Sequence, residues 1–151
     1  MVRISDEGVV STCNCNLPKL QVIHGQVSNG MICGGETPNT TNQCKELNPE
    51  SLEWEEWSPM NKKRTFHAMT TAGNQTRYIC GGLDVSIHHK HRSAILQSCE
   101  KFDGKWSFIK DLPIPLAGHC MIETDDLIYV IGGIYNIRVI IEKLKNIQIF
   151  V

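Results

Sequence analysis

This 151-residue sequence predicts an all-β fold made of repeated four-stranded units, and three observations support the prediction. Pairs of adjacent glycines begin at positions 34, 81 and 132, which are 47 and 51 residues apart. Each pair follows a short apolar run, as expected for a buried strand that ends at a sharp turn. Helical periodicity is absent, and short strands separated by turn residues indicate an all-β architecture. The pairs are Gly34-Gly35, Gly81-Gly82 and Gly132-Gly133.

Each repeated unit contains four expected strands with a characteristic residue in each. The first strand carries a histidine, the second ends at the glycine pair, the third begins with cysteine or isoleucine, and the fourth carries a tryptophan in the first two units. The spacing from Trp54 to His67 equals the spacing from Trp106 to His119, at 13 residues. The other members of these sets are His24, Cys44, Cys99 and Ile141. Elements that recur in the same order indicate repetition of one structural unit.

The order of these elements resembles the kelch repeat, a four-stranded propeller blade of about 50 residues. The resemblance extends over roughly residues 14 to 145 and implies kelch-type β-propeller blades in an incomplete ring. Another meander-rich β fold is the alternative. Arg64 also fits the arginine of the family pattern. The third-strand tyrosine of that pattern is replaced here by Leu47, Phe102 and Leu144.

The resemblance also implies how the chain is divided. It places the tail end of a preceding blade at 1–17, full blades at 18–57 and 58–110, and a partial blade at 111–151. Propellers have about four to eight blades, so about three blades leave uncovered sheet faces and open strand edges. We favour the interpretation that the chain is a piece of a longer propeller protein. Completion by self-association is the alternative.

Four of the seven cysteines vary together between the units. Cys33 and Cys80 directly precede glycine pairs, and Cys44 and Cys99 begin third strands, whereas the third unit carries isoleucine at both positions. The second and third strands of a blade are antiparallel neighbours whose facing Cα atoms lie about 4.5–5.5 Å apart, a distance that a disulfide accepts. We therefore predict the disulfides Cys33–Cys44 and Cys80–Cys99. Four buried free thiols are the alternative, and zinc is disfavoured because neither pair has a second Cys/His pair.

Two features favour an extracellular or secretory location. Persistent disulfides need an oxidising compartment, and Asn39 and Asn74 stand in N-glycosylation sequons within expected hairpin loops. Residues 1–15 lack the apolar segment of a signal peptide, which the interpretation as a piece of a longer protein explains. A cytoplasmic protein is the alternative. Cys120, next to a repeat histidine, is expected to be a buried small apolar residue.

The loop between Gly82 and Cys99 has 16 residues, against eight between Gly35 and Cys44. It contains a basic segment whose charge rises below about pH 6.5, formed by His88, His89, Lys90, His91 and Arg92. Long loops on a rigid scaffold often carry binding residues, so we predict that this segment binds an acidic or glycosylated protein. A merely solvated loop and a metal site of the three histidines are the alternatives. The net charge of −1 argues against general nucleic-acid binding.

The function implied by the resemblance is a non-catalytic protein-interaction scaffold from a secreted or cell-surface protein. Two alternatives stay open: the substrate-recognition propeller of an intracellular BTB-kelch adaptor for a cullin ubiquitin ligase, and a galactose-oxidase-like or sugar-epimerase propeller enzyme. The sequence has no paired carboxylates, phosphate-binding glycine loop or nucleophile elbow, so we predict no catalytic residue, metal ligand or cofactor. The glycine pairs, Trp54 and Trp106 are expected to be structural. The tryptophans should pack between blades, and the histidines should form hydrogen bonds within their strands.

Overall fold

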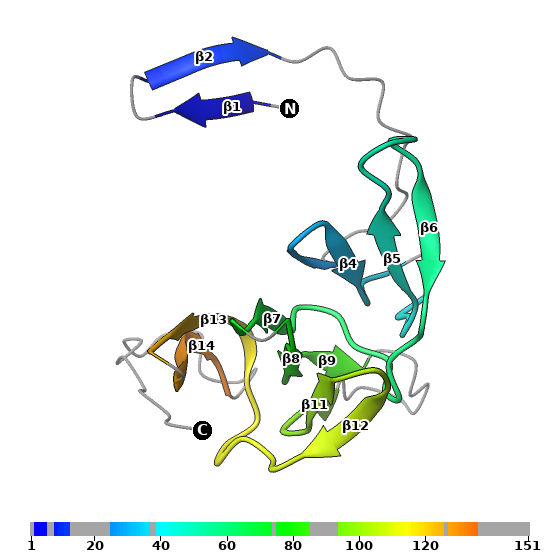
Figure 1. The fold of residues 1–151 in the computed structure, drawn as a ribbon. Helices are drawn as coiled ribbons and strands as arrows, with labels where there is room; N and C mark the ends of the chain where they lie inside the picture. The colour runs from blue at the N-terminus through cyan, green and yellow to red at the C-terminus, as the bar shows by residue number, and fades with distance from the viewer. Residues whose placement is uncertain are drawn as a thin grey trace.

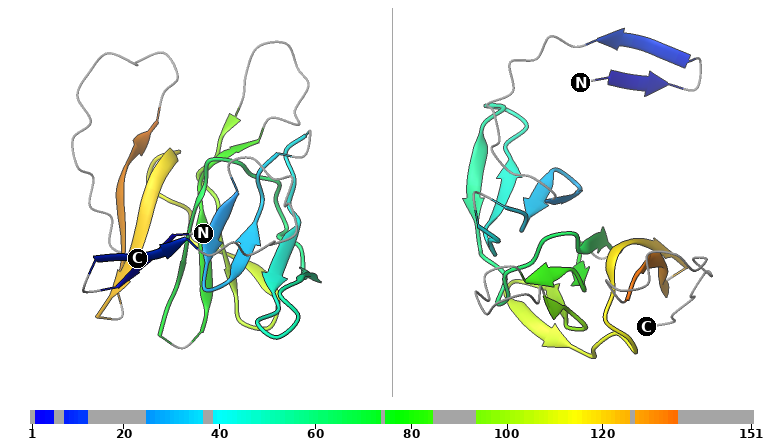
Figure 2. Two further views of the ribbon diagram at one scale, coloured as in Figure 1. Left: turned by 90° about the horizontal axis from the view of Figure 1, so that it is seen from above. Right: turned by 180° about the vertical axis from the view of Figure 1, so that it is seen from behind.

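The structure of the chain is a computed structural model that describes residues 2–5, 8–12, 25–36, 39–73, 75–84, 94–125 and 127–135. Within these residues every regular element is a β-strand, which confirms the all-β prediction. The strands form antiparallel sheets that follow one another along an arc, and the sheets do not close into a ring (Figure 1, and Figure 2, right). An incomplete ring of blades is therefore the observed architecture.

The first four-stranded sheet is an antiparallel meander in the order β3-β4-β5-β6. Its strands are β3 (Gln26–Ser28), β4 (Met31–Cys33), β5 (Cys44–Leu47) and β6 (Trp54–Trp57). Asn29 and Gly30 join β3 to β4, and their φ values of 46° and 73° are both positive, as a type I′ turn requires. This turn of two residues makes the first hairpin short.

The second four-stranded sheet repeats the same meander, in the order β12-β11-β8-β7. Its strands are β7 (Ala68–Thr71), β8 (Arg77–Cys80), β11 (Cys99–Phe102) and β12 (Trp106–Ile109). Two further short strands, β9 (Leu83–Asp84) and β10 (Ala94–Ile95), pair with each other inside the connection from β8 to β11. The two sheets thus share one topology, and the second differs by an elaborated connection.

The third sheet consists, in the described part of the chain, of β13 (Ala117–Thr124) and β14 (Leu127–Ile134). β4 and β8 end just before their glycine pairs, as predicted, but β14 runs on through Gly132 and Gly133. The reason is the length of β13, which still pairs there, His119 with Gly132 and Ala117 with Ile134. Residues 136–151, with the expected third strand at Ile141, lie outside the described residues. A separate hairpin near the N-terminus is formed by β1 (Val2–Ser5) and β2 (Gly8–Thr12).

The hydrophobic core lies between neighbouring sheets rather than within one sheet. Side chains alternate between the two faces of a strand, so each sheet contributes to two layers. The layer between the first and second sheets consists of Met31, Cys33, Cys44, Met60, Met69, Ile79 and Trp106. The layer between the second and third sheets consists of Ala68, Cys80, Cys99, Leu112, Leu116, Met121, Ile128 and Val130. Each layer therefore has residues from two adjacent blades, as stacked repeat units require.

Trp106 packs between the first two blades, as the sequence predicts. Its side chain is buried among residues of both sheets, and its indole Nε1 donates a hydrogen bond to the Ser58 carbonyl at 2.7 Å. Phe102 and Trp57 extend this aromatic contact, with Phe102 5.3 Å from Trp106 and 5.9 Å from Trp57 between ring centroids. Trp54 holds the position of Trp106 in the first sheet and is only half-buried. It lies on the face of that sheet turned away from the second sheet.

Candidate functional site

The candidate site consists of two equivalent loops, 34–43 in the first blade and 81–98 in the second. Each loop joins the second strand of its blade to the third. The loops close with equivalent backbone hydrogen bonds, from the Gly34 amide to the Gln43 carbonyl at 2.9 Å and from the Gly81 amide to the Ser98 carbonyl at 3.1 Å. Because the closing bonds correspond, both loops leave their blades at the same end.

The longer loop stands on a fixed stem. β9 and β10 pair at its base, and the Leu96 amide donates to the Gly82 carbonyl at 2.8 Å. Leu83 exchanges two backbone hydrogen bonds with Thr65, at 2.7 and 2.9 Å, which ties the stem to the segment leading into β7. The predicted partner-binding residues His88, His89, Lys90, His91 and Arg92 lie between β9 and β10, outside the described residues. Their role stays a prediction.

The shorter loop folds back on itself and exposes one predicted glycosylation site. A β-bridge joins Glu36 to Thr40, and the Thr41 amide donates to the Gly35 carbonyl at 2.9 Å. Asn39 is exposed at the turn, while Thr40 is buried. An exposed asparagine in a loop is what an attached glycan would require. Asn74 lies outside the described residues.

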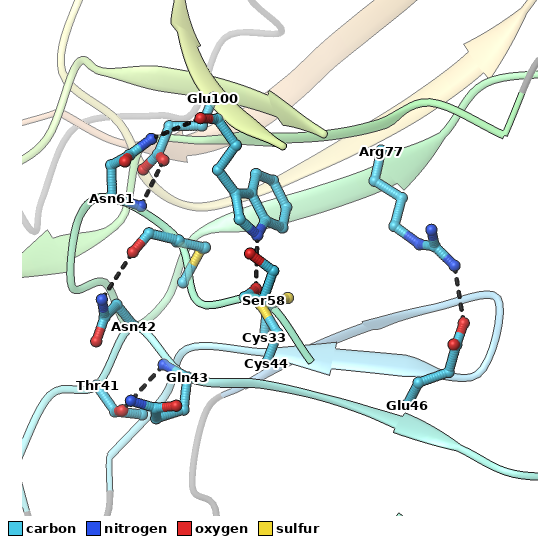
Figure 3. The surroundings of a disulfide bond; sticks show 12 residues. Cys33, Thr41, Asn42, Gln43, Cys44, Glu46, Ser58, Asn61, Arg77 and Glu100 are labelled. Atoms are coloured by element: carbon cyan, nitrogen blue, oxygen red, sulfur yellow. Dashed lines mark hydrogen bonds and ion pairs between the residues drawn. A yellow bond between two sulfur atoms is a disulfide. The ribbon is translucent and has the colours of Figure 1, made fainter. Parts of the chain in front are cut away.

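Both predicted disulfides are present, one at the base of each loop. Cys33 bonds to Cys44 and Cys80 bonds to Cys99, with a Cα–Cα distance of 4.1 Å in each (Figure 3 for the first). In each case the two cysteines are directly paired in the strand register. The bridges close loops of 11 and 19 residues in sequence separation, for which the chain-entropy estimate is about 3 kcal/mol each. They hold the bases of the candidate site together.

The glycine pairs allow the backbones of successive blades to approach closely. A Cβ built on Gly34 would lie 2.4 Å from the Arg64 carbonyl oxygen, and one on Gly81 would lie 2.3 Å from that of Leu116. The glycine that follows each of them donates its amide to the same carbonyl, at 2.9 Å in the first junction and 2.8 Å in the second. Both first glycines also have positive φ, at 63° and 65°. No other residue fits this junction without moving the next blade.

The repeat histidines pack their rings onto these glycines. His67 and His119 are buried, and their Cε1 atoms would lie 2.6 and 2.7 Å from a Cβ on Gly34 and Gly81. Neither ring nitrogen makes a hydrogen bond of normal geometry within the described residues. Packing is therefore the main contact of both rings, and His67 also lies close to the backbone of Cys33 and Arg64.

Burial sets the charge state of both histidines. It lowers the pKa of His67 to about 3, helped by the positive charges of Arg64 and of His119 and opposed by the backbone of Cys33 and Arg64. It lowers the pKa of His119 to about 4. Because a buried imidazolium without a counter-charge is unfavourable, both rings are neutral near pH 7.

The first repeat departs from this pattern at the histidine position. Gln26 pairs with Cys33 in the first blade, and Ala68 pairs with Cys80 in the second. The residue before Gln26 therefore corresponds to His67, which precedes Ala68. That residue is Gly25, and the sequence alignment of His24 with His67 is one position off because the first hairpin has the shorter turn. His24 itself lies outside the described residues.

A buried ion pair joins the entry of the second blade to its third strand. The Arg64 guanidinium lies 2.8 Å from the Glu100 carboxylate, and both side chains are fully buried. Arg64 also donates to the carbonyls of Gly81 and Ser98, at 2.8 and 2.9 Å, at the base of the longer loop. Burial lowers the pKa of Arg64, and Glu100 opposes that effect through its hydrogen bond and charge. The pair fixes the stem of the candidate site to the blade.

Cys120 contradicts its expected burial. Its thiol is free and exposed on β13. The prediction is wrong because Cys120 alternates with His119 and Met121, which face the second sheet, so its own side chain faces away from that sheet.

Comparisons with known proteins show what this arrangement is similar to. Models of known protein families gave no match. Kelch-like protein 15 of Danio rerio is 34% identical over 87 residues, covering 55% of this chain and 14% of that protein. Kelch-like protein 41a of Danio rerio is 28% identical over 109 residues, covering 71% and 18%, and human kelch-like protein 23 is 32% identical over 91 residues, covering 58% and 14%. The chain spans less than a fifth of the length of each of these relatives.

The solved structure of YjhT superposes with a TM-score of 0.71 at 14% identity, over 88% of this chain and 42% of that chain. At this identity the likeness concerns the fold alone, and it agrees with the repeated meanders and glycine junctions described above. The chain is therefore similar to kelch-like proteins in sequence, and its fold is that of kelch-type propeller blades. Its two complete sheets are kelch-type blades.

The kelch blades contain interactions that sequence reasoning missed. Asn42 and Gln97 occupy equivalent loop positions and donate side-chain hydrogen bonds to the carbonyls of Met60 and Leu112, at 2.7 and 2.8 Å. An amide two residues before the third-strand cysteine in both repeats is the signal that could have revealed them. Glu100 was also missed, because the first repeat has Lys45 at that position and no pattern is visible.

The described kelch blades offer no metal centre. Among the residues that the structure describes, no group of three or more His, Cys, Asp or Glu side chains is arranged to hold a metal ion. The same residues include no helix with the length and apolar character needed to cross a bilayer.

Proposed function

We propose that this chain is a non-catalytic protein-interaction scaffold whose loops 34–43 and 81–98 bind a partner protein at one end of the blades. The observation that carries the proposal is the fixed stem of the longer loop. Disulfide Cys80–Cys99, the Arg64 contacts and the Leu83–Thr65 bonds all hold its base. A rigid base that presents a long connection is typical of binding loops.

The partner suited to the longer loop is acidic or glycosylated, since the loop carries three histidines, a lysine and an arginine within five residues. The test measures binding of immobilised poly-glutamate and of a sialylated glycoprotein at pH 7.4 and at pH 6.0. The variant Lys90→Glu/Arg92→Glu should lose about tenfold in affinity. Binding should strengthen at the lower pH as histidines become protonated.

The matched control changes the same charge elsewhere. Lys105 is exposed in the turn between β11 and β12, at the other end of the second blade from the loop. Lys105→Glu is therefore the control for the single variant Lys90→Glu, because both alter the net charge by the same amount. This variant should bind as the unmodified chain does. An equal loss in both variants would show that net charge, and not the loop, attracts the probe, and the assignment of the loop would then be abandoned.

We place the protein in the secretory pathway or outside the cell, because the blades carry two disulfides and an exposed sequon at Asn39. The alternative is the propeller of an intracellular adaptor, which the relatives named kelch-like proteins favour. Alkylation of the native protein from its source, mapped by peptide mass, separates the two. Protected Cys33, Cys44, Cys80 and Cys99 support the first location, and alkylation of all four supports the second.

A further inference from the structure

An apolar surface on the third sheet has no partner in the described structure. It lies on the face of β13 and β14 turned away from the second sheet. Ile122 is 51% exposed and Ile131 is 38% exposed, and Cys120, directly paired with Ile131, is exposed beside them. We call Cys120, Ile122 and Ile131 the outer face of the third blade.

The same positions in the second blade are core. Ala68 pairs with Cys80 across the hairpin of the second blade, and Cys120 pairs with Ile131 across the hairpin of the third. Ala68 therefore corresponds to Cys120, and Cys80 corresponds to Ile131. Ala68 and Cys80 are each 1% exposed, because they pack against Leu116 and other residues of the third blade. The outer face of the third blade therefore has the composition of a blade junction, and no described sheet packs on it.

The backbone of the third glycine pair likewise has free space beside it at Gly132. Gly132 has φ of 73°, close to the values of Gly34 and Gly81, but a Cβ built on it meets no atom within 4 Å. At Gly34 and Gly81 that space is filled by a carbonyl oxygen and a ring from the next repeat. Gly132 thus has a junction conformation that none of the described residues uses.

The first blade carries the complementary face. Ile32 and Trp54 lie on the face of the first sheet turned away from the second, at the positions of Ile79 and Trp106. In the second blade these positions are 0% and 8% exposed and fill the junction to the preceding blade, whereas Ile32 and Trp54 are only half-buried. The two faces lie at opposite ends of the run of three sheets (Figure 2, right).

We propose that a second copy of this chain seats its first blade on the outer face of the third blade. The contact would repeat the two junctions already present within the chain, with Trp54 in the role of Trp106 and Gly132 in the role of Gly81. The contact is head-to-tail, and two such contacts related by a twofold axis close a ring. Two copies of about three blades fall within the usual four to eight.

The size of the solved neighbour supports this stoichiometry. One copy covers 42% of the YjhT chain, so two copies together would span most of a chain of that length. The inference does not depend on the proposed partner-binding function, because the loops 34–43 and 81–98 take no part in it.

The experiment measures the mass of the 151-residue chain by light scattering over a hundredfold range of concentration. In parallel, iodoacetamide alkylation of Cys120 is followed by peptide mass. We expect a dimer in which Cys120 becomes protected as the dimer forms, since its thiol lies on the proposed contact. A monomer at every concentration, or a polymer that grows without limit, overturns the two-copy ring, and a dimer in which Cys120 stays reactive overturns the assigned face.

Matched variants locate the contact. Gly132→Ala and Gly30→Ala introduce the same backbone strain, because both glycines have φ of 73° and free space at Cβ, yet only Gly132→Ala should weaken the dimer, by about tenfold. Ile122→Glu should do the same, whereas Phe108→Glu should not, because Phe108 is 58% exposed on β12 of the second blade, which takes no part in the contact. Equal effects of either variant and its control overturn the proposal. The Ile122 and Phe108 pair keeps the test valid if a glycine variant fails to fold.

Discussion

Arg64 and Glu100 form an ion pair at 2.8 Å in which neither side chain is exposed to solvent. Glu100 also accepts the backbone amides of Asn61 and Lys62, at 2.7 and 3.1 Å, as Figure 3 shows for Asn61. The carboxylate is therefore the acceptor for three donors on the segment that crosses from the first blade to the second. Burying these charges is unfavourable in itself. The pair therefore fixes the position of the connecting segment rather than adding net stability.

Removing one member of this pair should be severe. Glu100→Gln leaves a buried guanidinium without its counter-charge, and we expect a loss of about 3–5 kcal/mol in the free energy of unfolding. Urea denaturation measures it. Glu56→Gln is the control, because Glu56 pairs with Lys45 at 2.7 Å on the surface and such pairs are worth about 0–1 kcal/mol. Similar losses in the two variants would contradict the locking role of Glu100.

The glycine junctions predict a ranking of alanine variants. Gly81→Ala places a Cβ 2.3 Å from the Leu116 carbonyl oxygen, whereas Gly30→Ala has free space around its Cβ. Both carry the left-handed backbone strain of about 1–2 kcal/mol, and the collision should add about 1–3 kcal/mol at Gly81 alone. Thermal or urea unfolding checks the difference. Equal destabilisation would show that the close approach of the blades is relaxed easily.

The disulfide at the base of the longer loop should stabilise the fold only while oxidised. Cys80→Ser should lower the free energy of unfolding by about 3 kcal/mol under oxidising conditions and should differ little from the unmodified chain when both are reduced. An equal loss for Cys80→Ser in reductant would mean that the serine itself, and not the missing bridge, causes the effect.

The repeated features were predictable because they recur within the chain. Cys33 with Cys44 and Cys80 with Cys99 vary as pairs, and antiparallel neighbouring strands bring such pairs together. Trp106 was placed correctly between blades for the same reason. A residue pattern that occurs in two repeats of one chain can be recognised as structural by comparing the repeats with each other.

Features that depend on one blade's neighbour could not be predicted. The exposure of Cys120 depends on what packs on the outer face of the third blade, which its own hairpin does not encode. The Arg64–Glu100 pair joins residues 36 apart and has no counterpart at Lys45 in the first repeat. His24 was misaligned because the turn at Asn29-Gly30 shortens the first hairpin, and a turn length sets the strand register.

The buried histidines should make the fold sensitive to mild acid. Their pKa values in the folded state are about 3 for His67 and about 4 for His119, both lowered mainly by burial. An exposed histidine in the unfolded chain has a pKa near 6.5. Between these values the unfolded chain binds protons that the folded chain does not, so stability falls as pH falls. The stability that neutral histidines confer is complete above about pH 6.5 and is lost progressively toward the folded-state values.

We therefore expect acidification from pH 7 to pH 5 to lower the free energy of unfolding by about 2 kcal/mol for each histidine, at about 1.4 kcal/mol per pH unit below 6.5. Urea midpoints across this range measure the slope. His67→Phe and His119→Phe should each lower the number of protons taken up on unfolding by about one, and the slope should fall accordingly. Asp103→Asn should leave the slope unchanged, because Lys101 holds the pKa of the exposed Asp103 carboxyl below its usual range. A slope that persists in full in both phenylalanine variants would assign the acid sensitivity to other groups, and the neutral buried rings would then have no part in it.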